Sequence, residues 1–229
     1  MTSISLCMIV RNEAPRLQRA IDSARPHVDQ IVIVDTGSND GTVDIARDNR
    51  ATVAHIPFKD FSHARNYSIS LSRCEYIFVL DADEVLQGEL PEPKDNPKDK
   101  QAFTFHRANF GPDYRACDDA PLRLFPRWAV YEGRVHETVN GSVLRGGGSI
   151  RHTPVTIDHY LPSLADRRVK NLRYIEILKQ EIADAPDIQR MEFLAAEYYQ
   201  IGEFKQAAAV AGTTSACRQT TTASATAPG

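Results

Sequence analysis

The chain has 229 residues, of which 42% are hydrophobic and 25% are charged, and its formal net charge is −3. A chain of this length and composition is typical of one sizeable globular domain with a small appendage. The slightly negative charge gives no electrostatic reason to expect binding to nucleic acid or to an anionic membrane.

The cysteines and the apolar runs favour a cytoplasmic location. Cys7, Cys74, Cys117 and Cys217 are widely spaced and form no Cys-x-x-Cys pair, so the common zinc and redox motifs are not expected. The first apolar run ends at Arg11, which is too early for a secretion signal. No stretch approaches the roughly 18 apolar residues of a membrane span. We therefore expect a cytoplasmic protein with no transmembrane segment.

The first half of the chain alternates predicted strands with predicted helices. Apolar runs rich in β-branched residues predict strands at residues 4–10, 31–34, 52–56 and 76–80. Between these runs, Pro15 is expected to open one helix, Thr42 to cap a second, and residues 62–72 to form a third. This alternation predicts an α/β fold with a parallel, doubly wound sheet.

The second half begins with a change of pattern. Residues 91–101 are charged and rich in proline, which predicts an exposed loop. Shorter strand candidates follow at residues 103–107, 122–125 and 143–144. They indicate an antiparallel or mixed extension of the sheet.

From residue 164 the pattern becomes helical. Apolar residues recur at helical spacing to about residue 210, which predicts two helices and the start of a third after Gly202. Residues 212–229 have low complexity and are predicted to be disordered. The expected organisation is therefore a catalytic domain at 1–163, a helical segment at 164–211 and a tail at 212–229.

Polar residues follow three of the predicted strands where each should leave the sheet. These are Arg11 to Glu13, Asp35 with a glycine-rich turn, and the pair Asp81 and Asp83. Such ends converge on one edge of a parallel sheet, where ligands bind. Carboxylates placed there suit Mg²⁺ or Mn²⁺ together with a diphosphate. Solvated loop carboxylates and an Asx turn at Asp35 are the structural alternatives.

Four ordered blocks of sequence resemble the family-two inverting glycosyltransferases of the GT-A fold. The resemblance is closest to the bacterial branch that carries tetratricopeptide-like helices after the catalytic domain. The blocks are residues 6–13, 34–42, 61–66 and 79–84, and weaker matches lie at 131–137 and 158–160. The resemblance implies a mostly parallel sheet with an antiparallel extension, followed by a short helical segment.

The same resemblance implies a nucleotide-sugar donor, most often a UDP-sugar. Val10, Arg11, Asn12, Glu13, Asp35 and Gly37 are implied around the base and ribose, Arg65 and Asn66 near the nucleotide or its diphosphate, and Asp81 and Ala82 near the ribose or sugar. For Arg65 a surface ion pair is the alternative.

A divalent cation is implied as well, either Mn²⁺ or Mg²⁺. Asp83 is its expected ligand, with Asp81 and His159, the latter from a later loop, as further candidates. The cation would neutralise the departing UDP. An isolated histidine such as His159 is also compatible with a purely structural role.

Inversion at an anomeric carbon requires a base that takes the proton of the acceptor. Glu137 is the candidate that the resemblance implies, because this branch places an acidic residue near the acceptor. Glu137 could instead form a surface ion pair with Arg134 or Arg151, and Asp118 and Asp119 are competing acids.

Two other functions fit parts of the pattern. A nucleotidyltransferase also uses a pair of aspartates, but it usually has a glycine-rich loop after the first strand, and residues 11–15 contain no glycine. A non-catalytic scaffold that binds a partner through its helices is the second alternative, since barely one and a half helical repeats are present where solenoids need about three. The acceptor stays open between a saccharide, a lipid-linked glycan and a peptide.

Overall fold

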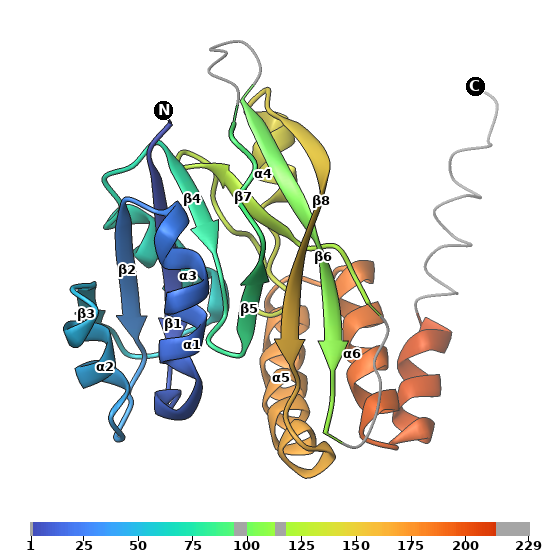
Figure 1. Ribbon diagram of the computed structural model, residues 1–229. Coiled ribbons are helices and arrows are strands. Elements are labelled where there is room, and N and C mark those ends of the chain that lie inside the picture. The colour runs from blue at the N-terminus through green and yellow to red at the C-terminus, as the bar shows by residue number, and fades with distance from the viewer. Residues whose placement is uncertain (1, 94–99, 113–117, 214–229) are drawn as a thin grey trace, which may run out of the picture. The chain divides into compact units, whose positions relative to one another are not determined.

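The structure is a computed structural model that describes residues 2–93, 100–112 and 118–213 (Figure 1). The chain divides into two compact units. Unit 1 consists of Met1–Gly133 and Glu137–Leu161, and unit 2 consists of Arg134–His136 and Pro162–Gly229. The predicted division at residue 163 stays a prediction.

Unit 1 is built on one eight-stranded sheet with the strand order β3-β2-β1-β4-β7-β6-β8-β5. Its strands are β1 Ile4–Val10, β2 Gln30–Asp35, β3 Thr52–His55, β4 Tyr76–Val79, β5 Glu84–Gln87, β6 Gln101–Phe110, β7 Leu122–Pro126 and β8 Ser149–Tyr160. Strands β1 to β4 pair in parallel, as do β6 and β8, whereas β7 and β5 pair antiparallel with their neighbours. The predicted α/β class, with a mostly parallel sheet and an antiparallel extension, is confirmed.

Helices cover the two faces of the parallel strands. They are α1 Ala14–Ala24, the 3₁₀ turn η1 Arg25–His27, α2 Thr42–Asp48 and α3 Phe61–Ser70, whereas α4 Asn140–Arg145 contacts β7 and β8 of the extension. Alternate side chains of a strand point to opposite faces. Leu6 therefore packs in the cluster that contains Leu17 of α1, and Cys7 packs in the cluster that contains Ile69 of α3.

The register of the parallel strands brings three loops to one edge. Val10 pairs with Asp35 and Asp35 pairs with His55, so β1, β2 and β3 end side by side. Strand β4 is parallel to β1 and ends at Val79, just before Asp81 and Asp83. The expected convergence of the loops is therefore present (Figure 1).

Three local predictions were wrong. Residues 143–144 lie in α4 instead of a strand, because Val139 and Val143 are four residues apart and both are buried, which is a helical period. Thr42 is the first residue of α2 and Gly41 is the cap, since the Thr42 hydroxyl is used by Asp40 and by the backbone of Glu13. His159 lies on strand β8 and not in a loop.

Unit 2 is helical. Helix α5 spans Leu164–Asp184 and α6 spans Ile188–Gln200, and a further helical run covers residues 204–213. Residues 134–136 join this unit through His136, whose Nε2 lies 2.9 Å from Oε1 of Glu197. The predicted helices are confirmed. The first two residues of the predicted tail continue the last helical run, and residues 214–229 lie outside the described residues.

Two further expectations concern segments that are described only in part. Residues 94–99 of the expected exposed loop lie outside the described residues. Within the described ranges, no helix has the length and apolar character needed to cross a membrane.

Candidate active site

The loops after β1 and β2 are bonded to each other. The backbone N–H of Asn12 donates to Oγ of Ser38 at 2.9 Å, and the N–H of Asn39 donates to Oδ1 of Asn12 at the same distance. Asn12 has φ of 56°, a left-handed conformation that asparagine tolerates better than most residues. The backbone of Thr36 donates to the carbonyl of Val10 at 3.0 Å. The residues predicted for the base and ribose therefore lie together, with Arg11 and Asn12 exposed and Glu13 half-buried.

Asp35 is buried at the end of β2 and its carboxylate is held by its own turn. The backbone N–H groups of Gly37 and Ser38 donate to it at 3.1 Å. Nδ1 of His55 lies 3.2 Å from Oδ2. Burial works against ionisation of Asp35, but the bonds from Ser38 and His55 outweigh it and lower the pKa of the carboxyl group. The Asx-type contacts of the structural alternative are thus present.

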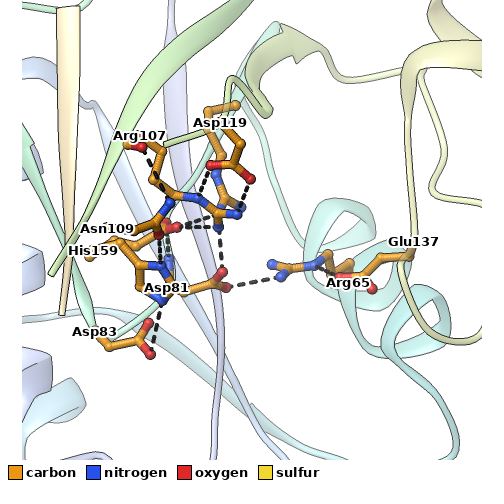
Figure 2. Close-up of polar contacts among 10 residues, drawn as sticks. Arg65, Asp81, Asp83, Arg107, Asn109, Asp119, Glu137 and His159 are labelled. Carbon is orange, nitrogen blue, oxygen red and sulfur yellow. Dashed lines mark hydrogen bonds and ion pairs between the residues drawn. The ribbon is translucent and has the colours of Figure 1, made fainter. Parts of the chain in front are cut away.

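Asp81 is held by two arginines. Arg65 of α3 donates from Nη2 to Oδ1 at 2.9 Å (Figure 2), and Arg123 of β7 donates from Nη2 to Oδ2 at 3.1 Å. Burial works against ionisation, but the two guanidinium groups outweigh it and hold the pKa of Asp81 well below its ordinary range. Each carboxylate oxygen of this predicted metal ligand therefore already has a cationic partner.

A buried charge network extends from Asp81 into the sheet. Glu84 has no exposed surface, and its Oε1 accepts from Arg107 at 3.0 Å and also from Arg123. Arg107 in turn forms two bonds to Asp119, at 2.7 and 2.5 Å. Such a network stabilises its buried charges only while every member has a partner.

Asp83 lies on the other side of Asp81 and faces a histidine. Its Oδ2 is 3.4 Å from Nε2 of His159, and the two side chains are 17% and 12% exposed. The backbone fixes this approach, because the N–H of Tyr160 donates to the carbonyl of Asp83 at 2.8 Å. Nδ1 of His159 lies 2.7 Å from Oδ1 of Asn109. The structure thus brings two of the three predicted metal ligands together.

Glu137 lies at the opposite end of the site. Its Oε1 accepts from Nε of Arg65 at 2.6 Å, and the side chains of Arg65 and Glu137 are 9% and 12% exposed. The partner is neither Arg134 nor Arg151, so the ion pair that Glu137 forms is with a buried arginine and is not the surface pair considered as the alternative. Arg65 links Glu137 to Asp81 (Figure 2).

Asn66 has a structural contact in place of the expected position facing a nucleotide. Its Nδ2 donates to the carbonyl of Tyr131 at 2.9 Å, and its Oδ1 accepts from the N–H of Tyr131 at 2.8 Å. This pair of bonds ties α3 to the segment that leads to Glu137. Ala82, next to Asp81, is buried in the core cluster of α1.

Sequence reasoning assigned no role to Arg123, Glu84, Arg107 or Asn109. A signal existed for Arg123, because it interrupts the apolar strand 122–125, and a charge in a buried strand requires a partner. No comparable signal marked Asn109, since its importance arises from the pairing of β6 with β8.

Comparison with known proteins gives one family and several relatives. Residues 5–93 match the family described as glycosyl transferase family 2. A TPR repeat-containing protein of Synechococcus elongatus is 46% identical over 87 residues, which is 38% of this chain and 22% of that protein. An uncharacterized glycosyltransferase of Rickettsia conorii is 35% identical over 153 residues, 62% of this chain and 54% of that protein. The chain thus spans about half or less of the length of these relatives.

The fold has a counterpart among solved structures. S. aureus TarS 1-349, in complex with UDP-GlcNAc, is similar to this chain with a TM-score of 0.50 and 11% identity. The similarity covers 88% of this chain and 73% of the other. At this identity the likeness concerns the fold alone, and it agrees with the GT-A class expected from the sequence.

Proposed function

We propose that this chain, which carries a glycosyl transferase family 2 domain at residues 5–93, transfers a sugar from a nucleotide sugar to an acceptor. The observation that carries the proposal is the arrangement at the carboxyl ends of β1, β2 and β4. A candidate nucleotide-binding residue, Asp35, and a candidate cation pair, Asp83 and His159, lie in one domain on one edge of its sheet.

A UDP-sugar is the proposed donor. The family supports a nucleotide sugar, and the structure similar in fold was solved with UDP-GlcNAc. In this chain Asp35 is ionised at neutral pH, because its pKa is lowered, and a carboxylate can accept hydrogen bonds from a uracil or ribose. The exposed Arg11 and Asn12 line the same strand ends.

The residues at Asp83 fit a divalent cation, Mn²⁺ or Mg²⁺. Two neighbouring ligands of an octahedral ion, each at about 2.1 Å, lie about 3.0 Å apart, and Asp83 and His159 approach to 3.4 Å. Among the described residues no group of three or more His, Cys, Asp or Glu could hold a metal ion. A Mg²⁺-type site needs no such group, because it uses one or two protein ligands with phosphate and water. When bound, the cation supplies charge neutralisation for the departing UDP.

Glu137 is the proposed base. In the described part of the chain Oε2 of Glu137 has no hydrogen-bond partner, whereas Oε1 is held by Arg65. The competing acids are less available: Asp119 uses both oxygens for Arg107, and Asp118 contacts the backbone of Asn109 and the ring of His106. Glu137 therefore combines a fixed side chain with one oxygen able to take a proton from an acceptor hydroxyl.

The chemistry assigned to the residues is then simple. Glu137 removes the acceptor proton as the new glycosidic bond forms on the face opposite the leaving group, which inverts the anomeric centre. Arg65 keeps Glu137 oriented and at the same time holds Asp81 in place. Asp83 and His159 hold the end of the site at which UDP leaves.

The test is a thermal-shift and hydrolysis panel of nucleotide sugars with Mn²⁺ or with EDTA. A UDP-sugar at about 100 times its Kd should stabilise the protein by roughly 2.7 kcal/mol, and hydrolysis should require the cation. Asp83→Asn should abolish the Mn²⁺-dependent hydrolysis, and Asp158→Asn, a nearby acid on β8 whose Oδ2 accepts from Gln87 at 2.9 Å, is the matched control. Binding without any hydrolysis would favour the non-catalytic scaffold, and no response to any nucleotide sugar would reject the proposal.

A further inference from the structure

Asn109 lies directly behind His159, on the side of the ring away from Asp83. Its Oδ1 is 2.7 Å from Nδ1 of His159, whereas Nε2 of the same ring faces Asp83 (Figure 2). Asn109 is only 7% exposed. Because β6 and β8 pair with Asn109 opposite His159, the backbone fixes the distance between the two side chains.

The surroundings of Asn109 determine which way its amide points. Its Nδ2 faces the carbonyl oxygen of Arg107 at 3.5 Å, and its side chain also bonds to Asp119. Burial works against ionisation of Asp119, but bonds from Arg107 and Asn109 contribute to lowering the pKa of its carboxyl group. A carbonyl and a carboxylate can only accept, so the NH₂ group must lie on their side and the carbonyl oxygen must face the histidine.

The amide orientation in turn determines the state of the imidazole. Since Oδ1 of Asn109 only accepts, Nδ1 of His159 must carry the hydrogen. With hydrogen on Nδ1, the uncharged form of the ring, which is the form that ligates metals, presents a lone pair at Nε2, toward Oδ2 of Asp83. Two acceptors that face each other at 3.4 Å cannot bond to one another, but both can ligate one cation.

We propose that Asn109 is a positioning residue that fixes the tautomer and the ring orientation of His159, so that Nε2 is the atom offered to the divalent cation. This inference rests on the proposed cation site at Asp83 and His159. A ligating histidine generally donates its other ring N–H to a carbonyl or carboxylate, and loss of that partner costs about 10–100-fold in metal affinity.

The first test measures the Mn²⁺ concentration that half-saturates UDP binding, by calorimetric titration at fixed UDP. Asn109→Leu keeps the size of the side chain and removes the acceptor, so this concentration should rise about 10–100-fold. Asn109→Asp is the comparison variant, because it keeps an oxygen opposite Nδ1 while it loses the NH₂ that faces Asp119, so the concentration should rise less than in Asn109→Leu. Equal Mn²⁺ requirements in wild type and Asn109→Leu would overturn the inference.

His159→Ala separates this inference from the proposed function. If His159→Ala leaves the Mn²⁺ requirement unchanged, His159 is not a ligand and both proposals for it fail. If His159→Ala raises the requirement while Asn109→Leu does not, the cation site stands and the positioning role alone is rejected.

The second test uses the wild-type protein and so does not depend on a variant that folds. In ¹⁵N-labelled protein at pH 8, the ring nitrogens of His159 report which of them carries the hydrogen, with His159→Gln identifying the signal. The expected state has hydrogen on Nδ1 and none on Nε2. Hydrogen on Nε2 with a bare Nδ1 would overturn the inference, whatever the Mn²⁺ titrations show.

Discussion

Asp81 and Asp83 lie two residues apart in the chain, yet their surroundings differ in kind. Asp81 has an arginine on each oxygen, Arg65 on one and Arg123 on the other. Asp83 faces the imidazole of His159. Residues 81–83 form a turn between β4 and β5, closed by a bond from the N–H of Glu84 to the carbonyl of Asp81 at 3.0 Å, and the two side chains point in different directions, as Figure 2 shows.

This difference suggests different roles for the two carboxylates of the Asp-x-Asp motif. A carboxylate that is already neutralised by two guanidinium groups has little left to offer a cation, so Asp81 organises the site through Arg65 and Arg123. Asp83 has a candidate second ligand, His159, opposite its carboxylate, which is why Asp83 is the member of the pair that we propose as the cation ligand. Arg65 also contacts Glu137, so the proposed base is connected to Asp81 and not to Asp83.

The largest expected effect is on the rate of sugar transfer, and it comes from a change at Glu137, which Arg65 connects to Asp81. Glu137→Gln keeps an oxygen for Arg65 but cannot accept a proton at neutral pH, so sugar transfer should fall by about 10²–10⁴. Affinity for UDP and its dependence on Mn²⁺ should not change, because the residues proposed to bind UDP and the cation are Asp35, Asp83 and His159. Steady-state transfer and calorimetric UDP binding on the same preparation test this. Loss of both sugar transfer and UDP binding would indicate that Glu137 has a structural role. Undiminished transfer would indicate that Asp118 or Asp119 is the base.

The second effect concerns stability. Arg123→Met keeps most of the side-chain length but removes one of the two arginines that hold Asp81 and one of the two that hold the fully buried Glu84, so the free energy of unfolding should fall by about 3–5 kcal/mol, the usual cost of breaking a buried ion pair. Asp83→Asn is the contrasting variant, with an expected change below about 1 kcal/mol. Urea unfolding followed by circular dichroism measures both. Equal changes in the two variants would contradict the division between Asp81 and Asp83.

The parallel strands and the position of the motif could be predicted from the sequence, because each depends on a local pattern. Strand β1 begins and ends where its apolar run does, and Asp81 and Asp83 follow β4 as expected. The family resemblance of residues 5–93 is confirmed for the same reason, since it depends on four compact blocks.

The partners of each carboxylate could not be predicted, because they arise from pairing among strands of the mixed extension and of β4 with it. Arg123 reaches Asp81 only because β7 pairs with β4, and Asn109 reaches His159 only because β6 pairs with β8. Strand β5 was missed, since four residues directly after the motif give too short a pattern, and with it the position of Glu84. Pairing between strands distant in the chain leaves no periodic trace in either strand alone.

A third, smaller effect concerns Asp35 at the end of β2, which can be compared with Asp83 after β4. Asp35→Ala removes the carboxylate proposed to bind the base or ribose, so affinity for UDP should fall at least tenfold, about 1.4 kcal/mol. The loss should be the same with Mn²⁺ and with EDTA, because Asp35 lies at the end of β2 and acts on the nucleoside, whereas the loss in Asp83→Asn should appear only with Mn²⁺. Unchanged UDP affinity in a folded Asp35→Ala protein would reject this role.

The smallest expected effect is the response of Asp81 to mild acid. The pKa of Asp81 is lower in the folded protein than its ordinary value of about 3.9, so its ionised form stabilises the fold fully above about pH 4. That contribution is lost only as the pH falls through the lower, folded-state pKa. The difference in unfolding free energy between wild type and Asp81→Asn should therefore stay constant from pH 7 to pH 5 and shrink below about pH 4. Urea unfolding across this range measures it, and a difference that already shrinks between pH 7 and pH 5 would mean that the arginines do not hold Asp81 in its ionised form.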